Sequence, residues 1–233
     1  MKAPNPVKVY AVSPEELPHG FGNLGMKLGR RSGPGARTDE ERQWWCLRRY
    51  LFTLRAVAEP EYPIFVLKGE RPDFRCSFGS RRLGIEIAEA SPHDQRKRRD
   101  FQRTGATAFL GTFRARTAAE RLWKADVLRT VRAKALKIAH YEPLPTYTIL
   151  LYSKSHAAQL TDHWSVVFDE LSPLNDRMWA WLGIRCRSLN RVAVICGEWL
   201  LLLEPGRVRY YPRRSGIAKE DKRLLGMRGD PRH

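Results

Sequence analysis

Two acidic residues in adjacent β-like segments are the side chains best suited to do chemistry. Asp73 follows Pro72, and Glu86 lies within the apolar segment 84–88. Carboxylates that converge on one spot in a basic protein are ligands that hold a divalent cation beside a phosphodiester. The two acids therefore indicate a metal-assisted phosphodiester site. Two solvent-facing acids of a hairpin are the alternative interpretation.

The alternation of apolar and polar residues predicts how these acids are positioned. Residues 73–78 and 83–88 each alternate with the period of a β-strand, and Gly79-Ser80 forms the turn between them. Antiparallel pairing would bring Asp73 opposite Glu86 or one residue from it. Glu86 shares its strand face with the small residues Gly84 and Ala88, so we expect room there for an ion and a phosphate.

A helix is predicted before these strands, from Thr38 to about residue 58. Thr38 and Glu41 form a capping box, in which each side chain satisfies a free backbone N–H group. Glu40 lies on the same helical stripe as Trp44 and the following apolar residues. It is either an N-terminal acid that favours the helix dipole or a carboxylate of the metal site.

A second helix is predicted over residues 117–141, after a basic segment. Lys134 lies inside its apolar stripe, between Val131 and Ile138. A lysine among core-facing residues is uncommon unless its ammonium group reaches a carboxylate or solvent. Lys124 is a second candidate for a lysine near the acids, although Glu120 is placed to pair with it.

These residues resemble the PD-(D/E)xK phosphodiesterase superfamily, which has the restriction-endonuclease-like fold. The resemblance covers roughly residues 38–152, and to 203 if the later strands extend the sheet. It implies that Asp73, Glu86 and the carbonyl group of Ile87 hold Mg²⁺ or Mn²⁺, with Glu40 as an assisting acid. The family lysine position is Ala88 here. Some members supply the lysine from the following helix, and this substitution assigns that role to Lys134.

The remaining pattern predicts an α/β fold with a mixed central sheet flanked by helices, built on an αβββαβ core. Residues 1–37 are expected to form a flexible basic arm, 38–211 a single nuclease-like domain, and 212–233 a basic tail. The C-terminal part of the domain is expected to add a helix that Pro173 ends and further strands. The predicted elements after the second helix are strand 147–152, helix 156–171, and strands 191–196, 199–203 and 208–211.

The charge of the chain predicts a nucleic-acid partner, with DNA favoured over RNA. Lys and Arg number 42 against 25 Asp and Glu, giving a net charge of +17. Phosphate contacts are expected along residues 95–137, mainly from Arg96, Lys97, Arg98, Arg99 and Lys137. No run approaches the roughly 20 apolar residues that cross a bilayer, and no signal peptide is recognised, so we expect a cytoplasmic protein without a membrane partner.

The four cysteines form no CxxC pair and are expected to be reduced and mostly buried. Loss of the lysine at position 88 is also typical of a catalytically inactive homologue, so a nucleic-acid-binding protein on the same fold stays open. A basic protein associated with RNA, with incidental acids, is a third possibility. The sequence leaves open endonuclease or exonuclease action, sequence specificity and a homodimeric state.

Overall fold

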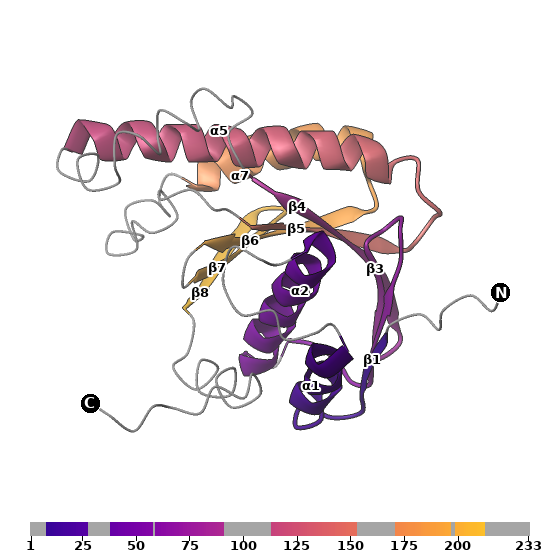
Figure 1. The fold of residues 1–233 in the computed structure, drawn as a ribbon. Helices are drawn as coiled ribbons and strands as arrows, with labels where there is room; N and C mark the ends of the chain where they lie inside the picture. Colours follow the sequence, from indigo (N-terminus) through magenta and orange to yellow (C-terminus); the bar gives the residue numbers. More distant parts are fainter. Residues whose placement is uncertain are drawn as a thin grey trace, which may run out of the picture.

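The protein has an α/β fold in which a mixed eight-stranded sheet carries helices on both faces (Figure 1). The structure is a computed structural model, and it describes residues 8–27, 38–57, 59–90, 113–152, 171–196 and 199–212. The strands follow one another across the sheet in chain order. Within these residues there are four helices. No helix among them is long and apolar enough to cross a membrane.

The central strands β4, β5 and β6 run parallel, and every other neighbouring pair is antiparallel. A parallel pair requires a crossover connection, and a helix precedes both β5 and β6. The strands from position 73 onward lie where the alternating and apolar runs predict them, and the short apolar, β-branched run 64–67 also forms a strand. The bounds are β1 Lys8–Ala11, β2 Ile64–Lys68, β3 Phe74–Phe78, β4 Arg81–Glu89, β5 Thr146–Tyr152, β6 Leu189–Cys196, β7 Trp199–Glu204 and β8 Arg207–Pro212.

Helices α1 (Leu17–Lys27) and α2 (Asp39–Ala56) cover one face of the sheet (Figure 1). The predicted capping box is present at α2: the Thr38 hydroxyl accepts from the Glu41 backbone N–H group, and the Glu41 carboxylate accepts from the Thr38 N–H group. The apolar stripe of α2 is buried from Trp44 to Leu54 in a core that it shares with β2 to β7, and α2 lies over β5 and β6. Near the start of the helix, Trp44 packs against Phe74 of β3. This packing fixes the start of α2 beside the end of the β3–β4 hairpin.

Helices α5 (Phe113–Ile138) and α7 (Leu171–Arg185) cover the opposite face (Figure 1). Val127, Val131, Ala135 and Ile138 of α5 are buried, as the helical period predicts. They pack with residues of β5, β6 and β7 in a second core. All four cysteines are free and buried, as expected.

Two expectations from the sequence are wrong, one about the N-terminal segment and one about Pro173. Residues 8–27 do not belong to a flexible arm, because β1 pairs with β2 and α1 packs on β1. Pro173 does not end a helix but lies in the first turn of α7. A proline is tolerated there because the first-turn N–H groups have no intrahelical acceptor. The predicted helix 156–171 lies outside the described residues up to position 170.

We expected open space beside Glu86 at the small residue Gly84. The Tyr147 ring fills that space instead. Gly84 is paired with Tyr147 across the parallel β4–β5 register. A Cβ atom at position 84 would lie 2.4 Å from Tyr147 Cε1 and 3.0 Å from Pro72 Cγ. The glycine is therefore needed for the aromatic ring to pack flat against the sheet.

Gly84→Ala is expected to lower the free energy of unfolding by about 2 kcal/mol or more, because the methyl group collides with a buried ring. Gly183→Ala is the matched control. No atom lies within 4 Å of its added Cβ, and the residue is inside α7, so alanine should raise stability by about 1 kcal/mol. Urea denaturation measures both. Equal stability of the two variants would contradict the packing of Tyr147.

Candidate functional site

Asp73 lies at the open end of the β3–β4 hairpin, away from its turn. Groups from β4 and α2 bind its carboxylate. The last pair of the register is Phe74 with Ile85, so Asp73 stands one step further along, opposite Glu86. Its Oδ2 atom accepts a hydrogen bond of 2.7 Å from the Ile87 backbone N–H group. Its Oδ1 atom accepts one of 2.9 Å from Gln43 Nε2 of α2. The carboxylate is thereby fixed beside the peptide between Glu86 and Ile87.

Glu86 is a buried carboxylate that faces α5. Its side chain is only 5% exposed. The Oε1 atom accepts hydrogen bonds from Lys134 Nζ at 2.6 Å and from the Tyr141 hydroxyl at 3.2 Å. The Oε2 atom is buried and has no hydrogen-bond partner within the described residues. A buried acceptor without a partner is costly, so this oxygen has an unused capacity to bind a cation or a donor.

Lys68, at the end of β2, adds a second ammonium group to the site. Its Nζ atom donates to Gln43 Oε1 at 2.6 Å and to the Asp73 carbonyl oxygen at 3.2 Å, and it lies 3.8 Å from Asp73 Oδ1. Burial lowers the pKa of Lys68, and the charges of Asp73, Glu40 and Glu86 oppose that shift. This ammonium group is thus held by Asp73 and Gln43 rather than by Glu86.

The surroundings of Tyr141 keep its hydroxyl group protonated. Burial, followed by the negative charge of Glu86 and the hydrogen bond to it, raises the pKa of Tyr141 to about 12. The Asp73 charge acts in the same direction. The hydroxyl is therefore a hydrogen-bond donor to Glu86 across the physiological pH range.

The structure brings together three of the residues that the sequence analysis singled out. Asp73 binds the backbone N–H group of Ile87, the residue after Glu86, and Lys134 of the following helix contacts Glu86. The charges of both acids act on Lys68 and on Tyr141. Lys124 lies ten residues earlier on α5, roughly 15 Å along the helix axis, so Lys134 is the lysine at this carboxylate. Ile87 contributes its backbone N–H group to Asp73. Its carbonyl group stays a predicted ligand.

Other predicted residues lie apart from this set. Glu40, expected as an assisting acid of the metal site, is exposed in the first turn of α2, and its charge acts on Lys68. Gln43, three residues further along α2, is the residue of this helix that contacts Asp73. Lys137 is exposed near the end of α5. The predicted phosphate-binding residues Arg96, Lys97, Arg98 and Arg99 lie outside the described residues.

Three contact residues were not found from the sequence, namely Gln43, Lys68 and Tyr141. Gln43 lies one helical turn after Glu40, and Tyr141 lies seven residues after Lys134, at two helical turns. These spacings could have placed Gln43 on the predicted helix face of Glu40, and Tyr141 on that of Lys134. Lys68 could not be assigned from spacing, because its contact depends on how β2 ends beside the turn that leads to Asp73.

An open depression lies at the turn between β2 and β3, next to Lys68. It has a volume of about 590 Å³ and is lined by Leu67, Lys68, Gly69, Glu70, Arg71 and Arg75. Its basic side chains outnumber its acidic one, which suits an anionic substrate. Within the described residues no three His, Cys, Asp or Glu side chains form a metal-binding group. A cation there would have two carboxylates and complete its shell with other oxygens.

The Lys134–Glu86 pair is expected to be energetically coupled. Lys134→Met removes the cation from a buried carboxylate and should destabilise the protein by about 2–4 kcal/mol, less than a fully buried pair because the lysine side chain is 22% exposed. The double variant Glu86→Gln/Lys134→Met should recover at least about 1 kcal/mol of that loss. A double-mutant cycle by urea denaturation measures the coupling. Additive effects would contradict the pairing.

Comparison of the chain with family models, with curated proteins and with solved structures finds no match in any of the three. The chemistry open to Asp73, Glu86 and Lys134 is therefore inferred from their geometry and their chemical types.

Proposed function

We propose that the protein is a Mg²⁺-dependent nuclease that hydrolyses phosphodiester bonds, with DNA as the favoured substrate. The observation that carries this proposal is the placement of two carboxylates on neighbouring strands: Asp73 binds the N–H group of the residue after Glu86, and Glu86 is bound by a lysine from the next helix. The proposal includes a restriction-endonuclease-like core made of α2, β2, β3, β4, α5 and β5. The order of these elements and the positions of Asp73, Glu86 and Lys134 support it.

The residues present fit a Mg²⁺ ion. The buried Oε2 atom of Glu86 has no protein partner in the described part of the chain, and Asp73 stands opposite it on the hairpin. Mg²⁺ commonly takes one or two carboxylates and fills its other positions with water and substrate phosphate oxygens. Asp73, Glu86 and the Ile87 carbonyl group would hold the ion. When bound, it lowers the pKa of an attacking water and offsets negative charge on the phosphate.

The chain's own residues act by positioning. Tyr141 and Lys134 hold the Oε1 atom of Glu86, which leaves Oε2 as the oxygen that would bind a cation. Gln43 and the Ile87 N–H group hold Asp73 in the same way. The Lys134 ammonium group has further protons to donate and can orient the attacking water. Positioning of this kind is a main source of rate enhancement in phosphodiester chemistry.

Substrate attraction is assigned to the basic surface around the depression. Lys68, Arg71 and Arg75 line it, and the net charge of the chain is +17. Phosphate contacts made by such residues release counterions, so binding should weaken with salt at a slope near −0.9 per phosphate contacted on B-DNA. Base-specific reading is not part of the proposal.

A specific observation favours a second function, binding of nucleic acid without cleavage. The Lys134 ammonium group lies 2.6 Å from Glu86 Oε1 and neutralises that carboxylate without a metal ion. Alanine also stands at position 88, where the resemblance places a lysine. Both features are compatible with a site that has lost its reaction and kept its basic surface.

Plasmid cleavage in the presence of Mg²⁺ tests the proposed reaction. Asp73→Asn and Glu86→Gln, which preserve side-chain shape, should each lower the cleavage rate at least about a hundredfold, because each removes a charged ligand. Glu61→Gln is the matched control, since its carboxylate is 57% exposed and pairs with Arg81 rather than with a residue of this site. Cleavage that survives in both acid variants would overturn the nuclease assignment. Tight DNA binding by a wild-type protein that does not cleave would establish the second function.

Metal binding is tested apart from activity by thermal unfolding. Mg²⁺ or Mn²⁺ at about one hundred times its dissociation constant should stabilise the wild-type protein by roughly 2.7 kcal/mol, and EDTA should remove the effect. Glu86→Gln should abolish the stabilisation, whereas Glu61→Gln should retain it. Equal stabilisation of both variants would place the ion elsewhere.

A further inference from the structure

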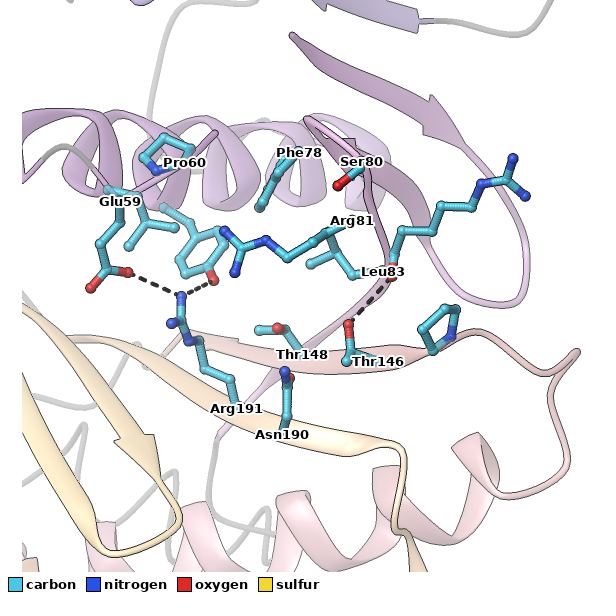
Figure 2. A pocket seen from close by; sticks show the side chains of 14 residues that line it. Glu59, Pro60, Phe78, Ser80, Arg81, Leu83, Thr146, Thr148, Asn190 and Arg191 are labelled. Atoms are coloured by element: carbon cyan, nitrogen blue, oxygen red, sulfur yellow. Dashed lines mark hydrogen bonds and ion pairs between the residues drawn. The ribbon is translucent and has the colours of Figure 1, made fainter. Parts of the chain in front are cut away.

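A second cavity lies at the opposite end of the central strands from the hairpin site. It has a volume of about 490 Å³ and is formed where β4, β5 and β6 begin, on the face covered by α2 (Figure 2). The turn before β4 and the segment after α2 close its sides. Glu86 lies further along β4 and faces α5, so this cavity is separate from the candidate nuclease site. Its volume falls within the usual range of small-molecule sites.

Two buried hydroxyl groups in its wall have unused donor capacity. Thr148 of β5 is 2% exposed, lines the cavity and makes no side-chain hydrogen bond within the described residues (Figure 2). Tyr50 of α2 is 1% exposed, and its hydroxyl oxygen accepts from Arg191 Nη1 at 3.1 Å. The Tyr50 proton is therefore left for another acceptor. Buried hydroxyl groups in native proteins are normally hydrogen-bonded, so an acceptor is expected between them.

The charged groups of the wall favour an anion as that acceptor. The acid of the lining, Glu59, is already ion-paired with Arg191 and Arg209. Arg81 reaches across the cavity in Figure 2 and pairs with Glu61 at 3.1 Å. Both side chains of that pair are more than half exposed, and such pairs contribute about 0–1 kcal/mol. Arg81 can therefore exchange Glu61 for a ligand at little cost.

Part of the wall is apolar, which indicates the shape of the ligand. Leu54, Phe78 and Leu83 line the cavity together with two prolines. Inorganic phosphate would leave this surface uncovered. A ring or apolar body carrying one anionic group would use both parts of the wall.

We propose that this cavity binds a small organic phosphate, of the class of nucleoside monophosphates. Arg81, Thr148 and Tyr50 supply donors for the three oxygens of a phosphate monoester, and the apolar wall packs against the attached body. This site does not depend on the proposed nuclease function, because none of its residues contacts Asp73 or Glu86 in the described structure.

Isothermal titration of the full chain with 5′-AMP and 5′-dTMP tests the proposal, with adenosine, thymidine and inorganic phosphate as separate arms. At least one monophosphate should bind more tightly than its nucleoside and than phosphate alone. Thr148→Val and Arg81→Gln should each weaken binding about tenfold, the usual effect of losing a hydrogen bond to a charged group. Arg129→Gln, an ion-paired arginine of α5 on the other face, should leave binding unchanged.

Asp73→Asn should also retain binding, which separates this cavity from the candidate nuclease site. Loss of binding in Asp73→Asn alone would place the nucleotide at the hairpin and overturn the proposal. Absence of binding by both monophosphates at millimolar concentration, or equal binding by wild type, Thr148→Val and Arg81→Gln, would overturn it as well. Arg81 is exposed, so Arg81→Gln remains informative if Thr148→Val fails to fold.

Discussion

The burial of Glu86 is the constraint on which the arrangement around the hairpin depends. A carboxylate that is 5% exposed must be neutralised or hydrogen-bonded, and Lys134 and Tyr141 at the end of α5 meet that need. These contacts fix where α5 ends over the sheet. They also tie α5 to β4, from which the Ile87 N–H group reaches Asp73. The buried Glu86 carboxylate thus links α5 to the β3–β4 hairpin.

Much of this arrangement could be predicted from the sequence, because it depends on local periodicity. Alternation in residues 73–78 and 83–88 gave the hairpin and the opposition of Asp73 and Glu86. The helical stripe of α5 placed Lys134 on the inward face. What could not be predicted depends on non-local contacts. Tyr147 fills the space at Gly84 from a neighbouring strand, and β1 with α1 is stabilised by a β2 edge far along the chain.

The two proposed sites use the same sheet in different ways. At the hairpin, carboxylates with limited protein partners form a surface suited to a cation and a phosphate backbone. At the start of β4, β5 and β6, hydroxyl groups and an arginine line a cavity suited to an anion. The two sites lie at opposite ends of the parallel strands β4, β5 and β6. Because these strands run in the same direction, different side chains stand at each end.

The ion pairs of Arg209 connect the last strand to a segment 150 residues earlier. Arg209 in β8 contacts both Glu59 and Glu204, and Arg191 shares the same two acids. Until β8 emerges from the ribosome, two partly buried carboxylates have only one guanidinium between them. A chain that lacks β8 would therefore carry excess negative charge at this junction, and this side of the sheet can close only once β8 has been made.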